Sequence, residues 1–170
     1  IYGYDYDQKK VISEGSGFFI DDKGTFITNA HVLKDAYFVK IRTLDGEFYD
    51  VNLMYTYSTK SSDHAICKAE DCVSVPLRFD PIYNVGDTVF ALGYPGSSVS
   101  LSVTEGVITS EPKTFAGITY IPNSATLIDG NSGGVLINER GFALGITTAY
   151  KPPEEYLALP FSAFADDLYA

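Results

Sequence analysis

The sequence contains no long apolar run and few basic residues. No segment approaches the roughly 18 to 20 consecutive apolar residues of a membrane-spanning helix, so we expect no membrane span. Lys and Arg number 12 against 22 Asp and Glu, which gives a formal net charge of −10. Because concentrated positive charge is needed to bind a phosphate backbone, we expect no nucleic-acid partner and attribute the excess acid to solubility.

The sequence also has few cysteines and histidines, the side chains that build disulfide frameworks and zinc centres. Its two cysteines, Cys67 and Cys72, are too few for a disulfide framework. Zinc would need two further ligands, and the two histidines, His31 and His64, do not lie at zinc-finger spacing from the thiols. We therefore expect no metal site. A single bridge between the cysteines stays open, because spacing alone does not fix disulfide geometry.

What the sequence does contain is a succession of short alternating or β-branched segments separated by Gly, Pro, Asn and Asp turns. This spacing is typical of β-sandwiches and barrels. The expected strands are 17–20, 25–28, 37–43, 47–54, 64–68, 88–92, 102–110, 117–121, 134–137 and 142–149. The only expected helix is terminal, over 162–169, with Ser162 as its N-cap.

The strand pattern is interrupted once, near the middle of the chain. About half of the expected strands lie on each side of this interruption, and 170 residues suffice for two small barrels sharing one core. We therefore predict one domain with four parts. These are an N-terminal barrel (1–78), an inter-barrel linker (79–84), a C-terminal barrel (85–161) and a C-terminal helix (162–170).

A serine flanked by glycines lies in the second half, in the Gly-Asn-Ser-Gly-Gly segment at 130–134. Such a loop can turn the N–H groups of the serine and of the residue two positions earlier toward one point. Small neighbours let a substrate carbonyl approach that point. We expect Ser132 to be a nucleophile, with an oxyanion hole over Gly130, Asn131 and Ser132 and the N–H groups of Gly130 and Ser132 as donors. A glycine-rich hairpin turn is the alternative.

A serine nucleophile needs a base and an orienting carboxylate. A lone histidine is more often structural, but His31 directly follows an apolar strand, where a short helical turn would aim its ring into a cleft. Asp63 opens another strand after two polar serines. The order His31, Asp63, Ser132 takes two members from the first half and one from the second. The sequence therefore predicts a catalytic site in the crevice between two barrels.

Three segments resemble the signature blocks of trypsin-like serine peptidases of the HtrA type: Thr-Asn-Ala-His-Val at 28–32, Asp-His-Ala-Ile at 63–66 and the serine block at 130–134. Further segments similar to this family lie at 15–18, 91–95, 103–110, 145–149 and 157–160. The resemblance runs in order from about Gly15 to Phe164, which is nearly the whole chain.

The resemblance implies an all-β, chymotrypsin/trypsin-like fold of two perpendicular, six-stranded antiparallel β-barrels. It also implies serine endopeptidase activity without a cofactor, on polypeptide substrates. Members of this family are often trimers, usually carry C-terminal PDZ domains and act outside the cytoplasm. A homo-oligomer and an extracytoplasmic location are therefore expected from the resemblance.

Two departures from related sequences bear on regulation. The family usually shows Asn-Pro before the serine block, where this chain has Ile128-Asp129, and we interpret Asp129 as a solvated loop acid. Digestive trypsins pair a new Ile N-terminus with an Asp directly before the nucleophile, but residue 131 here is Asn. That ion pair cannot form, so we expect control by ordering of loops rather than by cleavage.

The specificity pocket of this fold is formed by residues shortly before the nucleophile and by the strand that follows it. That position points to Thr126, Leu127, Thr147, Thr148 and Ala149 as substrate-binding residues. None of them is charged, so we expect a small or medium aliphatic side chain on the acyl side of the cut bond. Substrate backbone would add as a strand along 147–150, which suits extended or unfolded polypeptide.

Two other functions stay open at this point. One is a protease that is inactive in isolation because its oxyanion hole is collapsed until loops at 126–131 and 147–155 become ordered. The other is a peptide-binding module that keeps the fold but does no chemistry. Such a module normally lacks one member of the triad, whereas all three residue types are present here.

Overall fold

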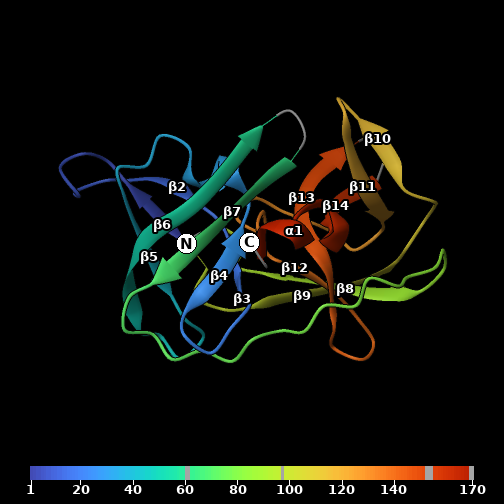
Figure 1. The fold of residues 1–170 in the computed structure, drawn as a ribbon, viewed down its shortest axis with the longest axis horizontal. Coiled ribbons are helices and arrows are strands. Elements are labelled where there is room, and N and C mark those ends of the chain that lie inside the picture. Colours follow the sequence, from blue (N-terminus) through green and yellow to red (C-terminus); the bar gives the residue numbers. More distant parts are fainter. Residues whose placement is uncertain (60–61, 97, 152–154, 169–170) are drawn as a thin grey trace.

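Strand pairing divides the chain into two antiparallel sheets, one from each half of the sequence (Figure 1). The computed structural model describes residues 1–59, 62–96, 98–151 and 155–168, without the side chains of 53–59 and 149–151. The first sheet has the spatial order β2-β1-β5-β6-β7-β4-β3. Its strands are β1 (Tyr2–Tyr4), β2 (Val11–Glu14), β3 (Phe18–Phe19), β4 (Thr25–Thr28), β5 (Phe38–Arg42), β6 (Phe48–Thr59) and β7 (Ser62–Ala69).

The second sheet has the spatial order β10-β11-β14-β13-β12-β8-β9. Its strands are β8 (Thr88–Gly93), β9 (Ser102–Val107), β10 (Lys113–Phe115), β11 (Ile118–Asn123), β12 (Val135–Asn138), β13 (Ala143–Lys151) and β14 (Glu155–Pro160). Each sheet thus uses strands from one half of the chain only.

The predicted fold class is confirmed: the described chain is nearly all-β, with two antiparallel sheets, and is consistent with a chymotrypsin-like two-barrel fold. Each sheet contains seven described strands rather than the expected six. The expected strands do not include β2 and β10, which are only four and three residues long. Segments this short do not show an alternation that separates them from loops.

The terminal helix is shorter than predicted. A 3₁₀ turn, η2 (Phe161–Ala163), comes first, and the α-helix α1 covers only Ala165–Leu168 within the described residues. Ser162 lies inside the 3₁₀ turn and is not the N-cap. The break falls at Phe164, whose backbone has φ −133° and ψ 2° and whose side chain is 1% exposed. Burial of this ring between the sheets takes its backbone out of the helical region.

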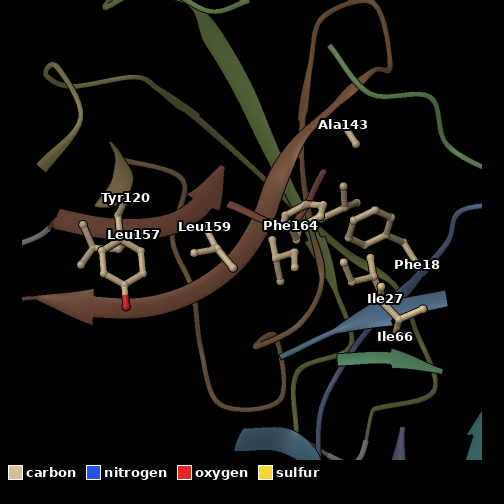
Figure 2. Close-up of a cluster of buried hydrophobic side chains, with 10 residues drawn as sticks. Phe18, Ile27, Ile66, Tyr120, Ala143, Leu157, Leu159 and Phe164 are labelled. Atoms are coloured by element: carbon tan, nitrogen blue, oxygen red, sulfur yellow. The ribbon is translucent and has the colours of Figure 1, made fainter. Parts of the chain in front are cut away.

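Phe164 belongs to a hydrophobic cluster shared by both sheets, whereas two further clusters each lie within one half. Figure 2 shows Phe164 close to Phe18, with Ile27 and Ile66 beside them and Leu159 on the opposite side. Because three of these side chains come from the first sheet and one from the second, the shared cluster fixes how the two halves face each other.

The segment that joins the halves is hydrogen-bonded to both of them. Leu77 N–H donates to Phe19 C=O at 3.0 Å, in the first sheet, while Asp80 N–H donates to Ala143 C=O at 2.9 Å, in the second. Ala143 N–H returns a bond to Arg78 C=O at 2.8 Å. The backbone near residues 77–80 therefore ties the two sheets together. The predicted linker boundaries at 79 and 84 stay a prediction.

Cys67 and Cys72, for which a bridge stayed open, are free thiols, both buried in the core of the first sheet. Within the described ranges, no group of three or more His, Cys, Asp or Glu side chains is placed to hold a metal ion. No helix in that part of the chain has the length and apolar character needed to cross a membrane.

Candidate active site

His31 lies on a short 3₁₀ turn, η1 (Ala30–Leu33), directly after strand β4. The turn begins where Asn29, in extended conformation, leaves the sheet. Ala30, Val32 and Leu33 are buried and anchor the turn, while the His31 side chain is 47% exposed. Burial of the three apolar side chains thus fixes the backbone of the turn, while the imidazole of His31 stays open to solvent.

His31 contacts both oxygens of the Asp63 carboxylate. Its ring Nδ1 lies 2.5 Å from Oδ2, and its backbone N–H donates to Oδ1 at 2.9 Å. A carboxylate can only accept, so Nδ1 carries the proton and Nε2 is left free to accept one. The structure therefore brings the predicted base and the predicted orienting acid together in the tautomer that base catalysis requires.

The environment of Asp63 keeps it ionised. Burial raises the pKa of this carboxyl, but the hydrogen bond and charge of the His31 ring and the backbone N–H groups of Ala30 and His31 outweigh burial. The pKa of Asp63 therefore lies below its ordinary value of 3.8. A charged Asp63 can stabilise a protonated His31 when the ring takes up a proton.

A buried amide supports this pair, and the sequence reading missed it. Asn29 is fully buried and its Nδ2 donates to Asp63 C=O at 2.7 Å and to Thr148 Oγ1 at 3.0 Å. The contacts join the end of β4, the start of β7 and strand β13. In the sequence, the only indication was a polar amide two positions before the histidine, at the end of a strand.

Ser132 lies in the loop between β11 and β12, on the second sheet, and is half-buried. The loop has positive φ at Gly130 (+95°) and Gly133 (+87°). A Cβ atom at Gly130 would lie 2.4 Å from Gly96 N, and one at Gly133 would lie 2.1 Å from Thr28 Oγ1. Both the backbone conformation and the close approach require glycine, which accounts for the sequence motif.

Contacts through Gly15 and Ser16 place the Ser132 loop against the histidine turn. Ser16 N–H donates to Ser132 C=O at 2.8 Å. A Cβ atom added at Gly15 would lie 2.4 Å from Val32 Cγ1, in the histidine turn, and 3.1 Å from Ser132 C=O. No hydrogen bond joins the Ser132 hydroxyl to His31 among the described side chains. In ligand-free sites this bond is often long and shortens only with substrate.

Some N–H groups of the serine loop donate to protein carbonyls, and others have no acceptor among the described residues. Asn131 N–H donates to Ile128 C=O at 3.0 Å, and Gly133 N–H donates to Thr147 C=O at 2.8 Å. Over the described part of the chain, the N–H groups of Gly130 and Ser132 donate to no protein acceptor. These are the two donors that the sequence predicts for an oxyanion hole.

The predicted substrate-binding residues differ in how the structure uses them. Thr126 is exposed and Leu127 half-buried, ahead of the serine loop. Thr147 and Thr148 are buried, and their hydroxyls donate to Asn131 C=O at 3.0 Å and Ile146 C=O at 2.9 Å. These two hydroxyls therefore stabilise the backbone of the site. The side chain of Ala149 lies outside the described residues, and a role in specificity stays a prediction for all five.

The second histidine is structural in character. His64 is 1% exposed, with Nδ1 2.5 Å from Ser62 Oγ and Nε2 2.9 Å from Asp167 Oδ2, which is on α1. Burial lowers the pKa of His64 below its ordinary value of 6.5, and the carboxylates of Asp167 and Asp63 offset only part of this effect. The ring is therefore neutral near pH 7, donates from Nε2 and accepts at Nδ1.

The comparison with sequence families gives one match, over residues 15–146, to the family described as "Trypsin-like peptidase domain". The matched segment contains His31, Asp63 and Ser132, and it spans strands of both sheets. It therefore covers both walls of the candidate site.

The chain is also similar to longer curated proteins. It is 33% identical over 155 residues to HhoA of Synechocystis sp., covering 85% of this chain and 39% of HhoA. It is 29% identical over 150 residues to the serine endoprotease DegS of Escherichia coli, covering 84% of this chain and 41% of DegS. It is 30% identical over 155 residues to the periplasmic serine endoprotease DegP of Escherichia coli, covering 86% of this chain and 32% of DegP. The chain thus spans about two fifths or less of these relatives.

Proposed function

Because the chain belongs to the family of trypsin-like peptidase domains, we propose that it is a serine endopeptidase with His31, Asp63 and Ser132 as its catalytic triad. The observation that carries the proposal is the pair of contacts from His31 to Asp63, at 2.5 Å and 2.9 Å. These contacts fix the tautomer of a solvent-open imidazole beside the glycine-bounded Ser132 loop. The names of DegS and DegP, which are serine endoproteases, support the same reaction.

The proposed reaction proceeds through an acyl-enzyme. Ser132 Oγ attacks the carbonyl carbon of the substrate while its proton passes to His31 Nε2. The resulting imidazolium, stabilised by Asp63, returns the proton to the leaving amine as the peptide C–N bond breaks. Water then attacks the acyl-enzyme by the same route, so that Ser132 regains its proton and the carboxylic acid product leaves.

The oxyanion of each tetrahedral intermediate would be held by the N–H groups of Gly130 and Ser132. Their lack of protein acceptors within the described residues leaves both available to a substrate oxygen. Removal of one such donor in related chemistry costs about 3 to 4 kcal/mol of transition-state stabilisation. The triad is therefore productive only when the loop around Gly130 has the conformation that forms this hole.

For the substrate we propose an extended or unfolded polypeptide that adds as a strand along residues 147–150. The exposed Thr126 and half-buried Leu127 would contact a small or medium aliphatic side chain. We also propose an extracytoplasmic location, which the name of the periplasmic DegP supports. We propose further that the chain forms a homo-oligomer. A trimer is the first state to test for, by light scattering.

The experiment that tests this function is intact-mass analysis after treatment with a fluorophosphonate, on the native chain and on Ser132→Ala. One stoichiometric adduct on the native chain and none on the variant is the expected result. No adduct on either chain would contradict a competent triad in this domain. An adduct on both would show that another group reacts, and Ser132 would lose its assigned role.

A further inference from the structure

Ser16 makes four hydrogen bonds around the serine loop, although the sequence reading gave it no role. It is 2% exposed and lies just before β3, in the first half of the chain. Its hydroxyl lies 2.7 Å from Gly130 C=O and 2.9 Å from Tyr94 N, and its backbone N–H lies 2.8 Å from Ser132 C=O. Its own carbonyl accepts from Thr28 Oγ1 at 2.6 Å.

The directions of these bonds are fixed by the groups involved. Gly130 C=O can only accept and Tyr94 N–H can only donate. The hydroxyl of Ser16 therefore donates its single proton to Gly130 and receives the proton of Tyr94 on a lone pair. Ser16 thus holds the carbonyls of Gly130 and Ser132, the two residues whose N–H groups face the predicted oxyanion.

A second bond fixes the peptide on the other side of Gly130. The carbonyl of Asp129 accepts from Gly96 N–H at 2.6 Å. In a trans peptide, C=O and N–H point in opposite directions, so this bond turns Gly130 N–H away from the loop that carries Gly96. With Asp129 C=O held by Gly96 and Gly130 C=O held by Ser16, both peptide planes around Gly130 are defined.

The geometry points to Ser16 as a positioning residue of the oxyanion hole, acting through Gly130 rather than by contact with substrate. This inference rests on the proposed peptidase function and adds to it a side chain that keeps the hole formed. Gly130 has φ +95°, and glycine can rotate at low cost into other regions. The flexible residue of the loop is therefore the one that needs an external bond.

Replacement of Ser16 by Ala removes the hydroxyl and leaves Gly130 C=O and Tyr94 N–H without their partner. The residue at 16 still supplies its backbone N–H to Ser132, so the loop keeps its connection to the first sheet. What the variant loses is the bond that holds the Gly130 carbonyl. The Asp129–Gly130 peptide is then held only by the bond from Gly96 N–H to Asp129 C=O. Because Gly130 can now rotate more easily, we expect that bond to break more often, with the Asp129 carbonyl turning into the position where the substrate oxyanion would lie.

Ser74 provides a matched control in a region away from the site. It is 8% exposed, and its hydroxyl donates to Asp21 C=O at 2.8 Å and accepts from Gly24 N–H at 2.9 Å. Ser74→Ala therefore removes the same two kinds of bond, with nearly the same lengths and similar burial. Any loss of stability common to both variants can be subtracted.

The kinetic test compares Ser16→Ala with Ser74→Ala on a peptide substrate. We expect Ser16→Ala to lower kcat by about 10- to 100-fold, less than loss of a whole donor, with KM and the pH profile of the reaction unchanged. Ser74→Ala should keep the native kcat. Equal values of kcat in the two variants would overturn the inference, as would an effect of Ser16→Ala on KM alone.

Amide hydrogen exchange provides a readout that does not depend on activity. Ser16→Ala should speed exchange at Gly96, which has no bond to Ser16, by at least about 10-fold, because Asp129 C=O turns away. Ser74→Ala should leave Gly96 unchanged and speed exchange at Gly24. If the native chain fails to react with fluorophosphonate, the proposed function fails. Loss of Gly96 protection in Ser16→Ala but not in Ser74→Ala would still establish the positioning role of Ser16. Unchanged protection at Gly96 would refute it.

Discussion

Two histidine–aspartate pairs meet at the start of β7 and differ mainly in how far the histidine side chain is exposed to solvent. Asp63 and His64 are neighbours in the chain, and successive side chains of a strand point to opposite faces. In the first pair the His31 side chain is 47% and that of Asp63 23% exposed. In the second, His64 is 1% and Asp167 28% exposed. The two carboxylates are therefore similarly exposed, and the pairs differ in the histidine, which lies at the surface in the first pair and in the interior in the second.

The comparison teaches that exposure, rather than the pair itself, decides the role. His31 keeps Nε2 open, so it can exchange a proton with a substrate. Both ring nitrogens of His64 are used, toward Ser62 and Asp167, and burial keeps its ring neutral. The second pair connects α1 to β7 directly beside Asp63, and we assign it to stability.

The largest difference between the two pairs should appear in kcat when the aspartate of each pair is neutralised in turn. Asp63→Asn presents an amide to His31 and favours the wrong tautomer, so we expect kcat for a peptide substrate to fall by about 10⁴-fold. Asp167→Asn, the matched change in the buried pair, should leave kcat unchanged. Similar losses in both variants would show that the buried pair takes part in the reaction and would break the comparison.

A smaller effect is expected when the histidines themselves are replaced and stability is measured. His64→Leu leaves Ser62 and Asp167 without their partner, and the free energy of unfolding should fall by about 1 to 3 kcal/mol. His31→Leu removes an exposed ring and should cost about 1 kcal/mol or less, while activity is lost. Urea denaturation of both variants at neutral pH measures the difference; a larger loss for His31→Leu would contradict it.

The smallest effect concerns pH. The pKa of His64 is lowered below 6.5 by burial, so the unfolded chain binds a proton that the folded chain does not, and the free energy of unfolding decreases as pH falls through 6.5. The pKa of Asp63 is lowered below 3.8, so its contribution is present above that value and is lost only in stronger acid.

Because other groups also titrate, the quantity to measure is the difference between the native chain and His64→Leu. That difference should shrink as pH is lowered from about 7.5 to about 5.5, as the native chain loses the contribution of a neutral His64. A difference that stays constant over this range would mean that His64 has the same pKa in the folded and unfolded chains.

The residues with distinctive chemistry were the most predictable from sequence. With only two histidines in the chain, the choice of a base was narrow, and His31 follows a strand and precedes apolar anchors. The contact between His31 and Asp63 was predicted and is present. The requirement for glycine at 130 and 133 was also expressed in the sequence, because positive φ and close approach leave few alternatives.

The roles of Ser16 and Phe164 could not be predicted in the same way. Ser16 acts on Gly130, 114 positions later in the chain, and on Tyr94, 78 positions later, and a serine between two glycines has no local feature that indicates such partners. Phe164 lies within a segment of helical pattern, yet tertiary burial of its ring shortens the helix. Both outcomes are set by contacts between the halves, which local periodicity does not contain.

The burial of both native thiols has a practical consequence for labelling. Cys67 and Cys72 are 0% and 5% exposed, and burial raises the pKa of both thiols, that of Cys67 to about 12. Since the thiolate is the reactive form, neither should react readily with a maleimide dye in the folded protein. A single cysteine introduced at the exposed Thr126 could then carry a fluorophore on an otherwise native chain and report peptide arrival in real time.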